Sequence, residues 1–103
     1  MDKESAIAIA KEYAQLVIQH IRPVEIILHG SYAKGTAREE SDIDIAVIVK
    51  DIIGDYLDLA AMLYHIRIDL DDRIEPILLE ESSEVSGFLE DVRKTGQRIY
   101  PSS

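Results

Sequence analysis

The sequence predicts a single α+β domain in which a small mixed sheet is covered by helices. Its 103 residues suffice for one domain, because domains usually contain about 50 to 200 residues. A hydrophobic fraction of 47% is enough for one core and excludes general disorder. Stretches with helical periodicity alternate with short β-branched runs, which favours helices packed on a sheet. We therefore treat residues 1–103 as one unit with the element order α-β-β-α-β-α.

Three segments predict helices. Residues 5–21 carry apolar residues at helical spacing, and Asp2 or Ser5 can cap the start of this helix. A second helix is predicted from Asp55 to about residue 67, and a last helix from Ser86 to about residue 95. One apolar stripe of the second helix is expected to comprise Leu57, Ala60, Ala61, Tyr64 and Ile68.

Short apolar runs between these helices predict the strands. Residues 24–29 and residues 43–49 are β-branched and apolar, which is typical of buried strands. Residues 74–79 form a third strand, and Pro76 within it indicates an edge position or a bulge, because proline cannot donate to a strand ladder. Residues 98–100 add a short last strand. The helices are expected to cover one face of the resulting sheet.

The loop after the first strand has the composition of a phosphate-binding turn, with room for one helical turn. Gly30 directly follows a buried strand, so the backbone can turn sharply and approach a ligand closely. Backbone N–H groups in such a turn, together with the Ser31 hydroxyl, form a cradle for phosphate oxygens. Gly35 is a second flexible point, and Lys34 and Arg38 add positive charge to the same loop.

Asp42 and Asp44 stand one residue apart at the mouth of the second strand. Because strand side chains alternate, both carboxylates leave the same face, with Cα atoms roughly 6.5 Å apart, while Ile43, Ile45 and Val47 point into a core. Mg²⁺ typically takes one or two carboxylates together with substrate phosphates. Two such ions about 3.5–4 Å apart stabilise the attacking and leaving oxygens of a phosphoryl displacement.

Gly-Ser and Asp-x-Asp pairs are each common in turns, but their conjunction is specific. A Gly-Ser pair, ten residues and then Asp-x-Asp resembles the signature of the DNA polymerase β-like nucleotidyltransferase superfamily, and the short chain resembles its minimal members. The resemblance covers residues 24 to about 79 and implies the nucleotidyltransferase fold. It implies that Gly30 and Ser31 bind the β- and γ-phosphates of ATP or another nucleoside triphosphate, and that Asp42 and Asp44 bind two Mg²⁺ ions. Ser41, just before the first Asp, is expected to touch the phosphates as well.

The family also uses a third carboxylate, on the strand after the intervening helix, which assists the metals and can act as the base. Glu75 is flanked by apolar residues within the predicted strand and is our preferred candidate. Asp72 and Asp71 remain as alternatives, although solvation is the simplest role for acids in a loop. Many relatives carry Asp at this position, so Glu75 and the adjacent Pro76 depart from the family pattern.

Charge and composition exclude several classes of function. The net charge of −9 argues against a broad nucleic-acid surface, which depends on neutralising phosphates with Lys and Arg. Residues 69–91 hold 9 acids and 1 base, an acidic face that could dock a basic partner. No apolar run approaches the roughly 18 residues of a membrane span, and the N-terminus lacks a signal peptide's apolar region. We therefore expect a cytoplasmic protein with no membrane contact, and without cysteine it has no thiolate zinc site.

The resemblance implies a magnesium-dependent enzyme that moves a nucleoside monophosphate, with AMP from ATP as the first choice, onto a hydroxyl. Minimal members are similar to the antitoxin half of toxin–antitoxin pairs, whose partner is a helical HEPN toxin with an adenylylated tyrosine. The alternative is a catalytically weak or inactive domain that neutralises its partner by forming a complex. The sequence leaves open the base of the nucleotide, the acceptor and the oligomeric state, a homo-oligomer included.

Overall fold

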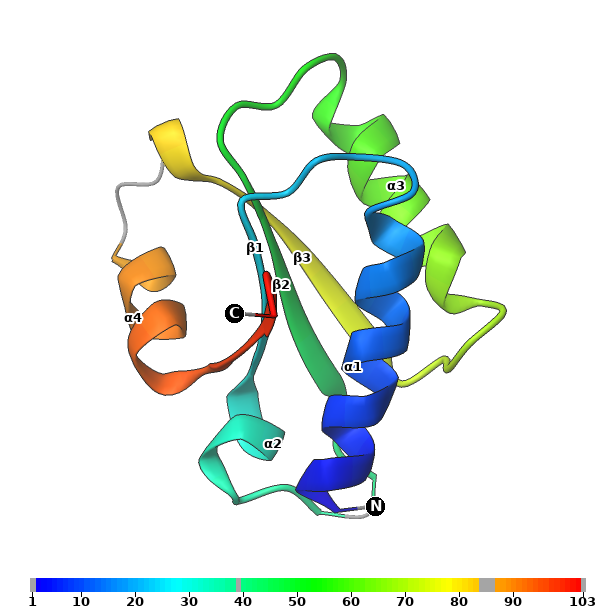
Figure 1. The fold of residues 1–103 in the computed structure, drawn as a ribbon, viewed down its shortest axis with the longest axis vertical. Coiled ribbons are helices and arrows are strands. Elements are labelled where there is room, and N and C mark those ends of the chain that lie inside the picture. The colour runs from blue at the N-terminus through cyan, green and yellow to red at the C-terminus, as the bar shows by residue number, and fades with distance from the viewer. Residues whose placement is uncertain (1, 39, 84–86, 103) are drawn as a thin grey trace.

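The computed structural model describes residues 2–38, 40–83 and 87–102, and a mixed sheet lies at its centre (Figure 1). The strand order is β3-β2-β1-β4; β2 runs parallel to β3 and antiparallel to β1, which in turn runs antiparallel to β4. The predicted α+β class and the mixed sheet are confirmed. The strands are β1 (Glu25–His29), β2 (Ile43–Val49), β3 (Ile74–Glu80) and β4 (Gln97–Tyr100).

The helices begin and end close to the predicted bounds, with two differences. The first helix ends before the predicted residue 21, because residues 18–20 form a turn ahead of Pro23. The predicted start of the last helix at Ser86 lies outside the described residues. The helical elements are α1 (Lys3–Val17), α2 (Gly30–Lys34), α3 (Tyr56–Arg67), the 3₁₀ turn η1 (Glu81–Ser83) and α4 (Phe88–Thr95).

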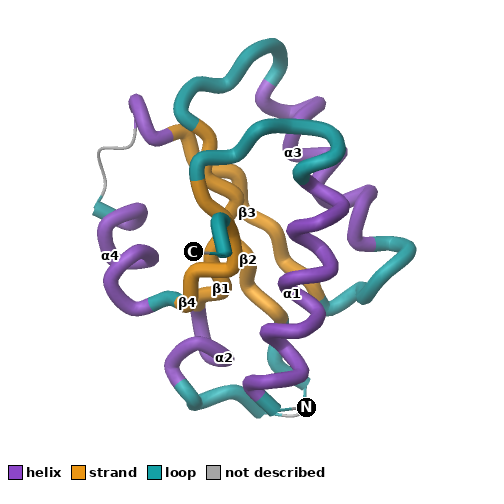
Figure 2. The backbone as a smooth tube through the Cα atoms, in the orientation of Figure 1, coloured by secondary structure: helices purple, strands orange, loops and turns teal. Residues whose placement is uncertain are grey.

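Helices cover both faces of the sheet, and the expectation that they cover only one face was wrong. Figures 1 and 2 show α1 and α3 on one side of the sheet and α4 on the other. The central strands are apolar on both faces, so each face needs a cover to exclude water. The face toward α1 and α3 buries Ile26, Leu28, Ile43, Ile45 and Val47. The face toward α4 buries Ile27, Ala46, Ile48 and Leu79 against Leu89 and Val92.

Helix α3 packs through a different stripe from the one the sequence predicts. The predicted stripe is largely exposed, since Leu57 and Ile68 keep 74% and 68% of their surface accessible. The helix carries apolar residues on more than one side, so periodicity alone admits two stripes, and packing against the sheet selects one. The residues that meet the core are Leu59, Met62, Leu63 and Ile66.

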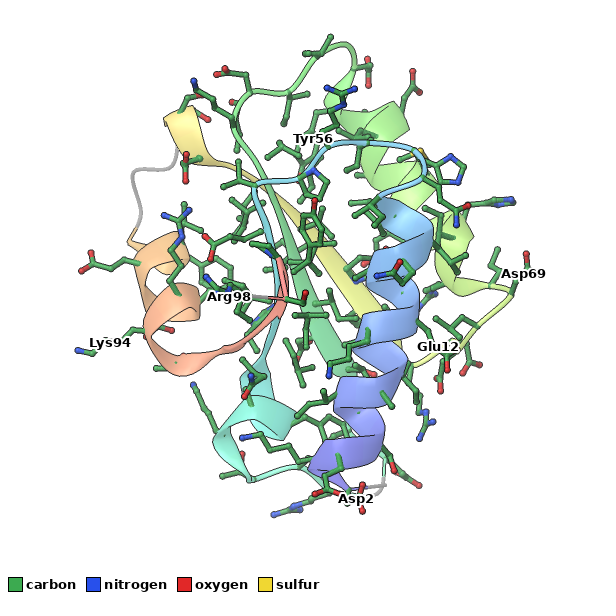
Figure 3. The ribbon with its side chains drawn as sticks, in the orientation of Figure 1. Asp2, Glu12, Tyr56, Asp69, Lys94 and Arg98 are labelled. Carbon is green, nitrogen blue, oxygen red and sulfur yellow. The ribbon has the colours of Figure 1, made fainter. Side chains whose placement is uncertain are left out.

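Two polar contacts stabilise α1 and join it to α3. Asp2 caps α1, because its carboxylate accepts a hydrogen bond of 2.8 Å from the Ser5 backbone N–H, as one of the two predicted caps. The buried Tyr13 hydroxyl of α1 donates to the Leu63 carbonyl of α3 at 2.7 Å. Asp2 lies at the N-terminal end of α1 and Tyr56 at the start of α3 (Figure 3).

Strand β3 lies at the edge of the sheet, as Pro76 predicts. It pairs with β2 alone, so the proline has no second neighbour that needs a backbone donor. Among the described residues, no helix is long and apolar enough to cross a membrane.

Candidate active site

Gly30 joins β1 to the short helix α2 and lies against Asp44 of β2. Its φ of +71° is in the left-handed region that favours glycine. A Cβ at this position would overlap Oδ2 of Asp44 and would lie 3.0 Å from the Asp44 Cγ. The sharp turn predicted after the first strand is therefore present, and one helical turn follows it, as allowed for in the prediction.

The register of the sheet places His29, Asp44 and Glu75 in one row. His29 of β1 pairs with Asp44 of β2, and Asp44 pairs with Glu75 of β3. Directly paired residues project from the same face of a sheet, so the three side chains are neighbours. A pocket of about 250 Å³ is lined by His29, Asp44, Tyr64, Glu75, Pro76 and Ile77.

A larger pocket, of about 440 Å³, lies at the opposite end of β2, around Val49 and Lys50. Its lining includes none of the predicted site residues. We place the candidate site in the smaller pocket, because reaction chemistry needs convergent polar groups more than apolar volume.

The three acids of the site repel one another electrostatically. Partial burial raises the pKa of the Asp44 carboxyl above its ordinary value, and the charges of Asp42 and Glu75 raise it further. Asp42 is exposed just before β2, while Asp44 is half-buried within the strand. A cluster of this kind favours either a bound proton or a bound cation, and it is the electrostatic pattern expected of a functional site.

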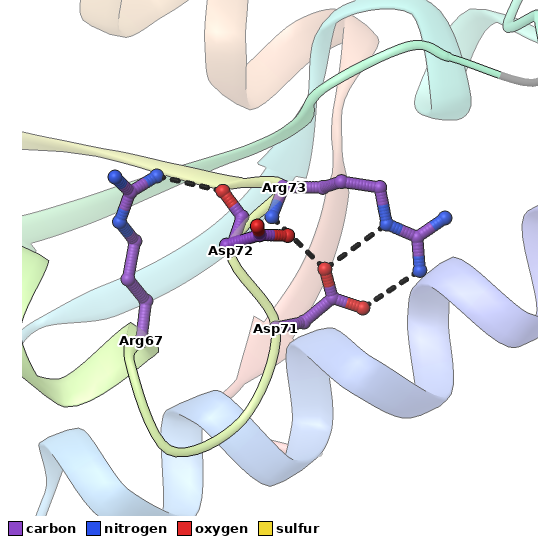
Figure 4. Close-up of polar contacts among 4 residues, drawn as sticks. All are labelled: Arg67, Asp71, Asp72 and Arg73. Carbon is purple, nitrogen blue, oxygen red and sulfur yellow. Dashed lines mark hydrogen bonds and ion pairs between the residues drawn. The ribbon is translucent and has the colours of Figure 1, made fainter.

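Glu75 is the only one of the three candidate third carboxylates that the register aligns with Asp44. Asp71 lies in the loop before β3, where its carboxylate binds Arg73 through Nε at 3.0 Å and Nη2 at 2.7 Å (Figure 4). Asp72 is exposed in the same loop, and its backbone carbonyl accepts a hydrogen bond of 2.8 Å from Arg67 (Figure 4). The preference for Glu75 over both alternatives thus gains support from the register and stays a prediction.

Tyr64 of α3 lines the candidate site, although helical periodicity predicts it on a stripe that packs into the core. Its hydroxyl donates a hydrogen bond of 2.8 Å to Oε2 of Glu75. This contact raises the pKa of the Tyr64 hydroxyl, because the neighbouring carboxylate stabilises the protonated phenol. Helical periodicity carries no signal for it, since the contact depends on the way α3 passes the sheet edge formed by β3.

The remaining predicted phosphate ligands lie in and after α2. Ser31 lies in α2 beside Gly30, and Lys34 ends this helix with an exposed side chain. Gly35 has a φ of +76° and terminates α2 in the left-handed conformation. Arg38 and Ser41 are joined by two hydrogen bonds, because the Arg38 N–H donates to the Ser41 Oγ at 2.7 Å and the Ser41 N–H donates to the Arg38 carbonyl at 3.0 Å. The Ser41 hydroxyl thus links Arg38 to the residue just before Asp42.

His29 forms one wall of the pocket. Its ring meets Phe88 of α4 edge-on, with centroids 5.9 Å apart. Burial lowers the pKa of the His29 imidazole, and the Lys34 charge lowers it further, while Asp91 opposes the shift. Its Nε2 is buried and has no hydrogen-bond partner among the described residues, and the same is true of the hydroxyl of Tyr32 in α2.

The donor set of the pocket fits Mg²⁺ as the family implies it. Mg²⁺ prefers carboxylate oxygens and usually takes one or two of them, with phosphates and water completing its shell. The mutual repulsion at Asp44 is the electrostatic condition that a divalent cation would relieve. Among the described residues, no group of three acidic or histidine side chains is close enough to hold an ion by itself. The arrangement therefore suits an ion that is coordinated partly by the nucleotide phosphates and not by protein ligands alone.

The mixed sheet covered by helices is the fold of a nucleotidyltransferase domain, and sequence comparison shows the same class. Residues 11–103 match the family described as "Polymerase beta, Nucleotidyltransferase". The chain belongs to this family, and the resemblance noted from the Gly-Ser and Asp-x-Asp motifs is confirmed.

Individual relatives support the same class. The chain is 43% identical over 61 residues to Putative protein adenylyltransferase MJ1305 of Methanocaldococcus jannaschii, a match that covers 55% of this chain and 42% of that protein. The chain thus spans less than half the length of this curated relative.

Two solved structures share the fold. A nucleotidyltransferase described as putative, from Sulfolobus solfataricus, superimposes with a TM-score of 0.66 at 22% identity, over 93% of this chain and 80% of that chain. A toxin–antitoxin structure with AMP-PNP superimposes with a TM-score of 0.61 at 28% identity, over 87% of this chain and 72% of that chain.

Proposed function

We propose that this protein transfers a nucleoside monophosphate, AMP from ATP in the first instance, onto a hydroxyl group. The observation that carries the proposal is the approach of Gly30 to Asp44, within a row that continues to Glu75. A glycine turn in contact with a carboxylate brings the N–H groups that would bind phosphate close to the carboxylates that would bind metal. Reactions at phosphorus need mainly positioning and charge stabilisation, which such a point supplies.

In this proposal, the loop holds the triphosphate. Gly30 and Ser31 would bind the β- and γ-phosphates, with Gly35 allowing the loop to close behind them. Lys34 and Arg38 would contribute positive charge from exposed positions. Ser41 would add its hydroxyl from the turn that leads into β2.

Asp42, Asp44 and Glu75 would hold Mg²⁺, with two ions as the expected number. The metal supplies a charge that neutralises the phosphates and stabilises the attacking and leaving oxygens. Glu75 would accept the proton of the acceptor hydroxyl; the hydrogen bond that its carboxylate receives from the Tyr64 phenol supports this role. A reaction of this kind draws on cytoplasmic ATP, so we propose the cytoplasm as its place of action.

The acceptor we propose is a tyrosine of a HEPN-type toxin, which makes this protein the antitoxin of a toxin–antitoxin pair. The similarity to a toxin–antitoxin structure with AMP-PNP supports this role and the choice of an adenine nucleotide. The segment 69–91, with 9 acids and 1 base in the sequence, would suit a basic partner by its charge.

Calorimetric titration with ATP and Mg²⁺ tests the proposal. The wild-type protein should bind ATP only with Mg²⁺ present. In an Asp42→Asn/Asp44→Asn variant, added Mg²⁺ should no longer increase the affinity for ATP. Asp69→Asn, in the loop before β3, is the matched control for removal of a surface acid and should bind as the wild type does. Equal binding by the double variant and the wild type would refute the metal assignment.

The alternative is a binding module that neutralises its partner without catalysis. It is favoured by one observation, the occupation of Glu75 by the Tyr64 hydroxyl. If the Asp42→Asn/Asp44→Asn variant still neutralises the partner and leaves it unlabelled, the binding module is the correct function.

A further inference from the structure

A hydroxyl of this chain already donates a hydrogen bond to the carboxylate that the proposed function assigns as the base. The Tyr64 Oη donates to Glu75 Oε2 at 2.8 Å, and both side chains line the same pocket as Asp44. Because β3 is the edge strand, a side chain from α3 can reach Glu75 past the sheet edge. An acceptor hydroxyl should lie within hydrogen-bond reach of the base that takes its proton, and Tyr64 satisfies this requirement.

The Tyr64 ring is held in this position by Arg67, one helical turn further along α3. The Arg67 guanidinium carbon lies 4.9 Å from the centroid of the Tyr64 ring. Arg67 Nη1 also donates to the carbonyls of Asp72 and Ile74, each at 2.8 Å, on either side of Arg73 at the start of β3. The phenol and the strand that carries Glu75 are thus tied to the same guanidinium.

No other tyrosine of the chain has this environment. Tyr13 is buried and bonded to the Leu63 carbonyl, and Tyr32 is buried within α2 with its hydroxyl enclosed. Tyr56 is exposed at the opposite end of α3, eight residues or about 12 Å along the helix from Tyr64. Tyr100 lies in β4, on the far side of β1 from β2 and β3. Tyr64 itself is 39% exposed, so a nucleotide on its oxygen has room toward solvent.

We propose that Tyr64 is a self-modification site, to which the protein transfers a nucleoside monophosphate within its own chain. The inference rests on the proposed nucleotidyl transfer and goes beyond it by naming an internal acceptor. The Tyr64 oxygen attacks the α-phosphorus and a phosphodiester bond forms. The bond from the α-phosphorus to the oxygen that bridges to the β-phosphate breaks, and pyrophosphate leaves with the electron pair. The phenolic proton passes to the Glu75 carboxylate, and no group is oxidised or reduced.

Modification of Tyr64 has a structural consequence for the site. The hydroxyl becomes an ester oxygen and no longer donates to Glu75, and the attached nucleotide lies over the pocket. A modified chain should therefore act poorly on any external acceptor, so that Tyr64 and the external hydroxyl compete for one position.

The experiment uses the full chain, incubated with Mg²⁺ and ATP labelled at the α-phosphate. Intact-mass measurement should show addition of one nucleoside monophosphate, and fragmentation of the tryptic peptide 51–67 should place it on Tyr64 rather than Tyr56. Tyr64→Phe should reduce labelling to the level of heat-denatured protein. The matched variant Tyr56→Phe, on the same helix and in the same peptide, should be labelled like the wild type.

Two further measurements separate this inference from the function on which it rests. Calorimetry with a non-hydrolysable ATP analogue and Mg²⁺ should show that wild type and Tyr64→Phe both bind the nucleotide, and both should unfold cooperatively, so that loss of labelling in Tyr64→Phe reflects loss of the acceptor. The labelled fraction at a given time should not change when the protein is diluted, because the acceptor belongs to the same chain.

Each other outcome overturns the inference in a recognisable way. If the wild type binds ATP and labels N-acetyl-tyrosinamide but leaves Tyr64 unmodified, the inference is wrong and the proposed function stands. Label on Tyr56, or a labelled fraction that rises with protein concentration, also overturns it. Failure to bind ATP with Mg²⁺ refutes the proposed function and the inference together.

Discussion

Gly30 and Asp44 are so close that a single methyl group at position 30 would collide with the Asp44 carboxylate. The contact joins the end of β1 to the start of β2 and brings the predicted phosphate turn onto the predicted metal ligand. Position 30 therefore has a steric requirement in addition to its left-handed backbone.

Gly30→Ala should destabilise the protein and abolish ATP binding. A left-handed Ala alone costs about 1–2 kcal/mol, and the collision with Asp44 adds to this. Gly54→Ala is the matched control, because its φ is +93° and, apart from its chain neighbours, no atom of the described residues lies within 4 Å of the added methyl. Urea unfolding and calorimetry should show a larger loss of stability for Gly30→Ala, with ATP binding lost only there. Equal effects of the two substitutions would refute the importance of the contact.

Asp44→Asn should stabilise the metal-free protein at neutral pH. The folded-state pKa of Asp44 lies above its ordinary value, so the folded form holds its proton to higher pH than the unfolded form does. By linkage, this contribution to stability is present below the ordinary pKa and is lost as the pH rises through the raised pKa. Urea unfolding across a pH series should show the wild type falling relative to Asp44→Asn over that window.

Added Mg²⁺ should reverse this difference when ATP is present, because the bound cation compensates the acids that repel Asp44. Asp69→Asn controls for removal of one surface negative charge. If the difference in unfolding free energy between wild type and Asp44→Asn stays constant across the pH series, the pKa of Asp44 is not raised in the folded protein.

Glu75→Gln should reduce nucleotidyl transfer by about 10²–10⁴-fold, which is the usual contribution of a general base. ATP affinity should change less, because Asp42 and Asp44 remain. Asp71→Asn and Asp72→Asn are controls in the neighbouring loop and should retain transfer. The rate of pyrophosphate release measures the effect, and loss of transfer in Asp72→Asn with retention in Glu75→Gln would reassign the third carboxylate.

Tyr13→Phe should lower the free energy of unfolding by about 0.5–1.5 kcal/mol, because it removes the buried hydrogen bond to the Leu63 carbonyl. This bond ties α1 to α3, the helix that carries Tyr64. Tyr56 is exposed on α3, so the control substitution Tyr56→Phe should have no measurable effect on urea unfolding. If both variants unfold at the same urea concentration as the wild type, the bond does not hold the two helices together.

Much of the architecture follows from local patterns in the chain. Residues 43–49 are predicted as a strand because they are β-branched and apolar, and β2 begins and ends at these residues. Pro76 predicts an edge position or a bulge, because proline lacks the donor that a central strand needs, and β3 lies at the edge of the sheet. The prediction of the buried stripe of α3 was wrong. The helix has apolar residues on several sides, so helical periodicity alone does not show which side is buried.

The sequence by itself determined the family and predicted the candidate site residues, because Gly30, Ser31, Asp42 and Asp44 follow one another within a short stretch of chain at a specific spacing. Only the tertiary structure decided which distant groups join them. The parallel pairing of β2 with β3 aligns Glu75 with Asp44, and the path of α3 past the sheet edge brings Tyr64 to Glu75. These contacts depend on strand register and helix packing over the whole domain, and no local pattern of residues encodes them.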